Sequence, residues 1–108
     1  MRNKFEKKIS LELAKFKRIK VEYESERIPY TLNYIPDFII TTQLGAKIYI
    51  ECKGYLRPEH RTKMIAVKRQ HPELDIRIVF YASNKKYTKW ADRHGFPYAI
   101  SSIPTEWF

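Results

Sequence analysis

The chain has 108 residues, the size of one domain, and its hydrophobic content of 44% supplies a packed core, which excludes a wholly disordered chain. Lys and Arg number 21 against 12 Asp and Glu; the net charge of +9 favours nucleic acid as the partner, and no apolar run approaches the roughly 20 residues that span a membrane. A single cysteine excludes a disulfide framework and fits a cytoplasmic protein.

The first half of the chain predicts a helix followed by three strands. A stripe of apolar residues at helical spacing predicts an amphipathic helix over residues 3–17. The stripe consists of Phe5, Ile9, Leu13 and Phe16. Alternation over 19–24 predicts a half-buried strand, with Glu24 among the charged residues that alternate with apolar ones. Two further apolar strands are predicted over 35–41 and 46–53.

The second half predicts two helices, two strands and a closing helical turn. These elements cover residues 58–70, 76–81, 85–94, 96–100 and 104–107. Pro58 suits the first turn of a helix, Gly95 suits a helix C-terminus, and Pro97 confines its strand to a sheet edge. The order α-β-β-β-α-β-α-β predicts a mixed α/β sheet flanked by helices, built as a single domain over 1–108.

The most specific motif is Pro36-Asp37 followed by Glu51-Cys52-Lys53. Side chains alternate along a strand, so Glu51 and Lys53 project to the same side. A hairpin through residues 41–45 brings Asp37 beside them. Two carboxylates and an ammonium at one point are typical of a nuclease site that holds a divalent cation and activates a water.

The ligands expected for Mg²⁺ are oxygens, which Asp37, Glu51 and the backbone carbonyl of Cys52 supply. Glu6 in the first helix is a further candidate acid. Lys53 either deprotonates the attacking water or stabilises the charge that grows on the phosphate, and the sequence leaves both roles open. The Cys52 side chain is interpreted as a small buried group that faces away from the site, and His60 as a surface or turn residue.

The basic residues fall into groups that suit contacts with DNA phosphates. Such contacts give affinity without reading sequence, and no recognition-helix motif is present. The candidate DNA-binding residues are Lys4, Lys7, Lys8, Arg57, Arg61, Lys63, Lys68, Arg69, Lys85 and Lys86.

Pro-Asp followed at strand distance by Glu-x-Lys resembles the signature of the PD-(D/E)xK nuclease superfamily. Longer segments resemble the phage endonuclease I family, the Holliday-junction-resolving enzymes of T-odd coliphages. These segments are Phe5-Glu6-Lys7-Lys8, Val21-Glu22-Tyr23-Glu24, Ile28-Pro29-Tyr30, residues 34–38, 51–54 and 69–80, and Ile103-Pro104-Thr105-Glu106-Trp107. The likeness covers nearly the whole chain.

This resemblance implies a restriction-endonuclease-like core and an active site of Glu6, Asp37, Glu51 and Lys53 with Mg²⁺ or Mn²⁺. It implies hydrolysis of phosphodiesters at four-way junctions and other branched DNA, leaving a 5′-phosphate, in phage recombination or DNA processing in the host cytoplasm. Members of the family act as homodimers that exchange strands through a bridge. Here the corresponding segment, residues 30–34, is several residues shorter.

Three alternatives therefore stay open. The short bridge leaves room for a monomeric endonuclease that nicks one strand. The charge of +9 on its own would also fit a DNA-binding module without catalysis. A more remote alternative is a mismatch-directed nicking enzyme of the same superfamily, although no insertion is present that would read a mismatch.

Overall fold

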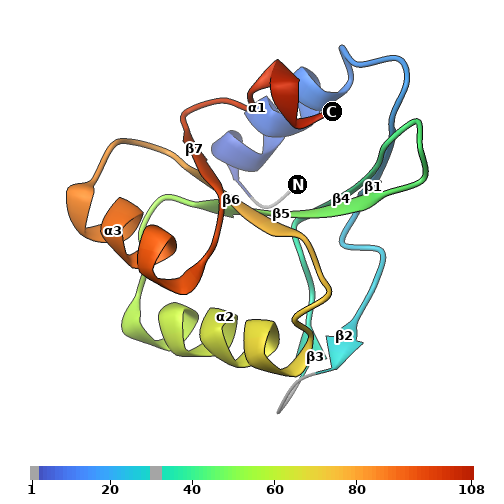
Figure 1. Cartoon of the computed structure of the whole chain (residues 1–108). Coiled ribbons are helices and arrows are strands. Elements are labelled where there is room, and N and C mark those ends of the chain that lie inside the picture. Colours follow the sequence, from blue (N-terminus) through green and yellow to red (C-terminus); the bar gives the residue numbers. More distant parts are fainter. Residues whose placement is uncertain (1–2, 30–32) are drawn as a thin grey trace.

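The structure is a computed structural model that describes residues 3–29 and 33–108 (Figure 1). Five strands form the main sheet, in the order β1-β4-β5-β6-β7. Their bounds are β1 Lys20–Tyr23, β4 Phe38–Thr41, β5 Lys47–Lys53, β6 Ile76–Phe80 and β7 Tyr98–Ile100. The β1–β4 and β4–β5 pairs are antiparallel, whereas the β5–β6 and β6–β7 pairs are parallel, so the sheet is mixed as expected.

The helices cover both faces of this sheet. Helix α1 (Lys4–Leu13) and the 3₁₀ turn η1 (Thr105–Trp107) lie on one face, while α2 (Pro58–Gln70) and α3 (Lys85–His94) lie on the other (Figure 1). Both later helices have the bounds that the sequence predicts. Asn84 caps α3 through its side chain, and Gly95 ends it in the left-handed conformation at φ 75°.

Two apolar cores follow from the alternation of side chains along the strands. Ile48 and Ile50 of β5 join Ile9 and Leu13 of α1 on one face. Tyr49, between them, joins the core beneath α2 and α3 on the other face. Successive residues of one strand therefore serve opposite sides of the molecule, which places Glu51 and Lys53 on the side of α2. No helix among the described residues is long and apolar enough to cross a membrane.

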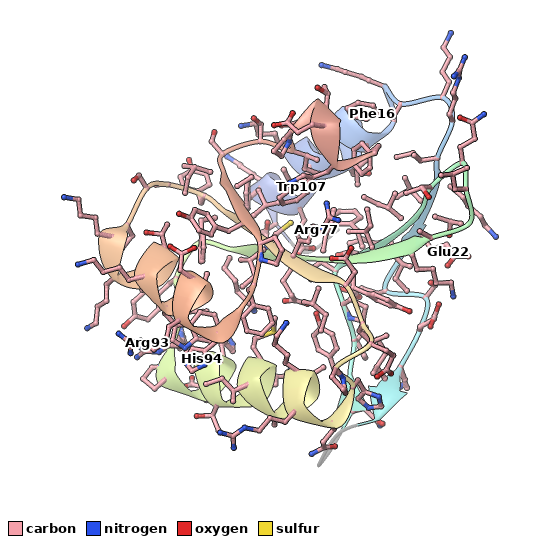
Figure 2. All side chains as sticks on the ribbon, viewed as in Figure 1. Phe16, Glu22, Arg77, Arg93, His94 and Trp107 are labelled. Carbon is pink, nitrogen blue, oxygen red and sulfur yellow. The ribbon has the colours of Figure 1, made fainter. Side chains whose placement is uncertain are left out.

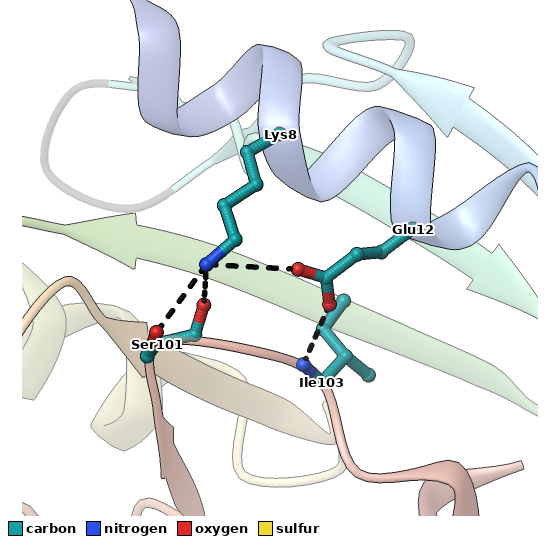
Figure 3. Close-up of polar contacts among 4 residues, drawn as sticks. All are labelled: Lys8, Glu12, Ser101 and Ile103. Atoms are coloured by element: carbon teal, nitrogen blue, oxygen red, sulfur yellow. Dashed lines mark hydrogen bonds and ion pairs between the residues drawn. The ribbon is translucent and has the colours of Figure 1, made fainter.

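The C-terminal segment holds α1 against the sheet. Lys8 Nζ donates to the Ser101 carbonyl at 2.9 Å, and Glu12 Oε1 accepts from the Ile103 amide at 3.1 Å (Figure 3). Farther along, the Trp107 ring lies 5.2 Å from the Arg77 guanidinium carbon of β6 (Figure 2). These contacts fix the helix that carries Glu6.

The first helix is shorter than predicted. It ends at Leu13, and the chain then turns, so Phe16 lies outside the helix. The Phe16 ring packs against the C-terminal residue, with its centroid 4.9 Å from the Phe108 ring centroid. Its helical spacing reflects packing against the C-terminus and not a continued helix.

Two strand predictions also need correction. Strand β4 begins at Phe38 and not at residue 35. The preceding residues belong to a separate two-stranded sheet, in which β2 (Ile28–Pro29) pairs with β3 (Asn33–Tyr34), and residues 35–37 connect this sheet to β4. Val21 is exposed because β1 is an edge strand. Of the predicted bridge, residues 30–32 lie outside the described residues.

Candidate active site

The four candidate catalytic residues line one cavity of about 360 Å³. It opens where the N-terminus of α1, the approach to β4 and the end of β5 meet. Glu6 reaches it from the side of α1, whereas Glu51 and Lys53 reach it from the side of α2. Asp37 lies close to both groups of residues, so the charges of both Glu51 and Glu6 raise its pKa.

Glu6 is placed by the way α1 begins. The Asn3 side chain caps the helix by accepting a hydrogen bond from the Glu6 amide at 2.8 Å. Glu6 then lies in the first turn with only 3% of its surface exposed, and the Tyr23 hydroxyl of β1 donates to its Oε1. The carboxylate is therefore held by two elements.

Asp37 connects the start of β4 to the end of β5. Its Oδ2 accepts a hydrogen bond from the Cys52 amide at 2.8 Å. The Cys52 side chain packs toward the α1 face, away from Glu51, but the residue is half-buried and lines the cavity, whereas the sequence predicted a buried group that faces away from the site. Burial, helped by the nearby Asp37 and Glu51 charges, raises the pKa of this thiol, so it stays protonated.

Glu51 and Lys53 form an ion pair, with 3.3 Å between Lys53 Nζ and Glu51 Oε2. The other carboxylate oxygen, Glu51 Oε1, is buried without a hydrogen-bond partner among the described residues. The buried Tyr34 hydroxyl lies beside this carboxylate: burial, and next the Glu51 charge, raise the pKa of Tyr34, and Tyr34 in turn helps to lower the pKa of Glu51. A buried carboxylate with so few donors is costly, so this arrangement fits a site for a cation.

The electrostatics of the cavity lead to the same conclusion. Burial, and next the Glu51 charge, raise the pKa of Asp37 from 3.8 to about 8. Burial likewise raises the pKa of Glu51, although Lys53 opposes the shift. Two buried carboxyls that resist joint ionisation form a site that a divalent cation would stabilise.

Glu24 is an acid that the sequence pattern did not single out. One carboxylate oxygen each of Glu6, Glu24 and Asp37 lies within 4.8 Å of the other two. Glu24 has a left-handed backbone with φ 49°, rare for a glutamate, and its amide donates to the Asp37 carbonyl at 3.2 Å. The sequence pattern groups Glu24 with the charged residues that alternate along the strand. Because β1 ends at Tyr23, this turn breaks that alternation.

His60 also lies nearer to the site than expected. It is half-buried and lines the cavity from the first turn of α2, although it joins no group of candidate metal ligands among the described residues. Burial, and next the Lys53 charge, lower the pKa of His60, so its imidazole is neutral at neutral pH. Spacing in the sequence gives no sign of this contact, which depends on how α2 packs.

The candidate DNA-binding cations are distributed over both faces. Lys4, Lys7 and Lys8 lie on α1 and border one shallow groove. Lys63 lines the catalytic cavity itself. Lys68 already contacts the protein, because its Nζ donates to the Gly95 carbonyl at 3.1 Å and lies 5.0 Å from the Phe96 ring centroid.

The remaining cations are arranged around α2 and α3. Arg57 precedes α2, Arg61 is half-buried on it, and Arg69 is exposed near its end. Lys85 and Lys86 are exposed in the first turn of α3. They lie on the face of the sheet opposite the lysines of α1, and Arg69 borders a separate groove with Lys68 and His94 (Figure 1).

A solved structure described as an EndoMS–double-stranded DNA complex resembles this chain with a TM-score of 0.54 at 12% identity, covering 97% of this chain and 48% of that one. The chain thus spans about half of that protein. The fold is of the restriction-endonuclease-like class, as the sequence predicts. The sequence pattern that defines phage endonuclease I matches residues 1–108, and the chain belongs to the phage endonuclease I family.

Two curated relatives extend this result. The chain is 37% identical over 119 residues to endonuclease I of Escherichia phage T7, covering 98% of the chain and 76% of the relative. It is 38% identical over 116 residues to endodeoxyribonuclease 1 of Enterobacteria phage T3, covering 95% and 73%. These relatives are DNA-cleaving enzymes, which confirms the predicted family, the nuclease class and DNA as the kind of substrate.

Proposed function

We propose that this chain is a metal-dependent, structure-selective endonuclease that hydrolyses phosphodiesters at four-way junctions and other branched DNA. The observation that carries the proposal is the convergence of Glu6, Asp37, Glu51 and Lys53 on one cavity, with Glu51 Oε1 buried and without a donor among the described residues. Family membership supports DNA cleavage, and the alternative of a module without catalysis leaves this acid cluster unexplained.

The donor set fits Mg²⁺ or Mn²⁺. Asp37, Glu51 and the Cys52 carbonyl would hold the ion, and Glu6 and Glu24 would add carboxylates from the α1 side. Such an ion would lower the pKa of a coordinated water and neutralise negative charge on the phosphate. These hard oxygen donors, without a histidine or thiolate among them, favour such ions over zinc.

The protein's own groups then act on the substrate. Lys53, held at 3.3 Å from Glu51 and mostly buried, would orient the attacking water or stabilise the negative charge that grows on the phosphate oxygens. Water oxygen bonds to phosphorus as the bond to the 3′ oxygen breaks, and that oxygen takes up a proton. The products are a 5′-phosphate and a 3′-hydroxyl.

Resolution of a four-way junction needs two opposed cuts. One chain offers one such cavity among its described residues, so we propose a homodimer as the working form. A monomer would instead nick one strand at a time. Cleavage of a single junction substrate distinguishes the homodimer from the monomer.

The test is cleavage of a supercoiled plasmid with an extruded cruciform, with Mg²⁺ and with EDTA. Wild type should cut only with the metal, Glu51→Ala and Lys53→Ala should not cut, and Lys53→Ala should still bind the junction. Lys47→Ala is the matched control, because Lys47 lies on the same strand but pairs with Glu26 at 2.6 Å, outside the cavity. The control should cut like wild type.

Linear product that appears directly means paired cuts by a dimer, whereas nicked circle that accumulates first means single cuts by a monomer. Absence of metal-stimulated cleavage of any branched DNA would refute the proposed function. Loss of cleavage in Lys47→Ala would mean that positive charge on β5, and not the position of Lys53, is what matters.

A further inference from the structure

Two exposed tyrosines lie beside the end of β5 that carries Lys53: Tyr55 lines the catalytic cavity, and Tyr81 contacts the Lys53 backbone. Tyr55 keeps 64% and Tyr81 keeps 61% of its surface in solvent. Single exposed apolar residues are ordinary on a protein surface, as Leu44 at the tip of the β4–β5 hairpin illustrates. Tyr55 and Tyr81 differ because both lie next to the end of β5, where Lys53 is located.

The backbone fixes their position relative to Lys53. The Tyr81 amide donates to the Lys53 carbonyl at 2.9 Å, and Tyr55 lies two residues after Lys53 and lines the cavity. A Cβ placed on Gly54, between Lys53 and Tyr55, would lie 4.0 Å from Tyr81 Cβ. The strand end that carries the candidate catalytic lysine is therefore flanked by two aromatic side chains.

Each ring packs against neighbouring side chains but keeps most of its surface in solvent. Tyr81 packs edge-to-face on Phe5 of α1, with centroids 5.3 Å apart. Tyr55 packs on Tyr87 of α3 at 6.3 Å, and the Arg57 guanidinium carbon lies 5.9 Å from its centroid. The two rings thus extend from opposite faces of the sheet, and their partners reduce the ordering that a ligand would have to impose.

A nucleobase is the ligand that this surface suits. It offers a flat polarisable face to an aromatic ring, and its phosphate would meet the cations Lys53, Arg57 and Lys63 at the cavity. Bases within a continuous duplex have both faces covered by their neighbours. Bases at a branch point can lose a stacking neighbour, so this surface would favour a branch over plain duplex.

We propose that Tyr55 and Tyr81 form a stacking surface with two separate positions, one toward each face of the sheet, for unstacked bases beside the scissile phosphate, and that this surface contributes to the selection of branched DNA. The inference rests on the proposed function, because it takes branched DNA to be the substrate. It adds a source of selectivity that the acidic cluster and the lysine do not supply.

The test measures DNA affinity in EDTA, where no cleavage is expected, by anisotropy of labelled DNA. The DNAs are a four-way junction, a duplex with one unpaired base and a plain duplex of equal length. We expect Tyr55→Leu/Tyr81→Leu to bind the first two roughly 10-fold more weakly or worse, since stacking on an aromatic ring is worth about 1–3 kcal/mol per base. Affinity for plain duplex should change by less than about twofold, because its bases are already stacked.

Tyr55→Phe/Tyr81→Phe separates stacking from hydrogen bonding, because it keeps both rings and removes both hydroxyls. It should bind like wild type, as should Leu44→Ala, an exposed apolar control far from the cavity. A second readout is 2-aminopurine placed next to the cut site, whose fluorescence should respond to wild type and the Phe variant but not to the Leu variant.

Equal losses on branched and plain DNA, or a Phe variant as weak as the Leu variant, would overturn the stacking inference. So would a Leu variant that binds and cuts the junction like wild type. These outcomes leave the proposed function standing, because wild type would still cut branched DNA. If wild type neither binds nor cuts branched DNA, the proposed function itself fails.

Discussion

The buried Asp37 carboxyl lowers the stability of the metal-free protein when it is ionised, and it is also a candidate cation ligand. Its pKa is 3.8 in its ordinary state and about 8 in the folded protein, because burial and Glu51 oppose its ionisation. The unfolded chain therefore releases this proton first as the pH rises, so stability falls between about pH 4 and pH 8. Below pH 4 the penalty is absent, and above pH 8 it is complete.

We therefore expect thermal melting of the metal-free protein to shift downward as the pH rises from 5 to 8. Asp37→Asn keeps an acceptor for the Cys52 amide and removes the charge, so it should flatten this slope and melt roughly 5 °C higher at pH 8. Mn²⁺ should raise the melting temperature of wild type more than that of Asp37→Asn. Parallel melting curves for the two proteins at every pH would contradict this account.

Glu24 allows a second prediction at the residue scale. Its carboxylate lies with those of Glu6 and Asp37, so Glu24→Gln should weaken Mn²⁺ binding, measured by titration calorimetry, by about 10-fold or more. Glu22→Gln is the matched control, because Glu22 pairs with Lys20 at 3.2 Å and accepts from Ser25 at 3.1 Å (Figure 2). Equal effects of the two variants would mean that only the net charge matters.

At the scale of elements, the seating of α1 decides where Glu6 lies. Glu12 Oε1 accepts from the Ile103 amide at 3.1 Å, so Glu12→Ala leaves a partly buried donor without its partner. We expect urea denaturation to show a loss of about 1–3 kcal/mol in the free energy of unfolding. Lys8→Ala should cost less than about 1 kcal/mol, because its contacts with Ser101 and Glu12 are exposed. A larger loss for Lys8→Ala would mean that the ion pair, and not the amide contact, secures the helix.

At the scale of the whole molecule, the charge of +9 controls the association with DNA. If six to ten of the candidate cations contact phosphates, affinity should fall by roughly 10³-fold or more between 50 and 200 mM salt. Anisotropy titrations over that range measure the slope. Lys63→Ala should reduce the slope by about one, whereas Lys68→Ala should reduce it less, because Lys68 already contacts Gly95 and Phe96. An affinity that does not change with salt would contradict an electrostatic mode of binding.

Local pattern was sufficient for most of the secondary structure. The two later helices begin and end as predicted because Pro58, Asn84 and Gly95 act within one turn of the backbone. The boundaries that differ depend on distant partners: Phe16 leaves its helix to meet Phe108, and β4 starts only at Phe38, after Tyr34 has paired with Ile28 in a separate sheet.

The sequence by itself determined the family, the class of fold and the candidate group of Asp37, Glu51 and Lys53, because strand alternation and one hairpin bring these residues together. Only the tertiary structure decided that Glu24 joins the acids, that His60 and Tyr55 line the cavity and that Tyr81 lies beside the end of β5. Those positions follow from a left-handed turn after β1, from the packing of α2 and from the pairing of β5 with β6. Such contacts join residues far apart in the chain, and no local periodicity encodes them.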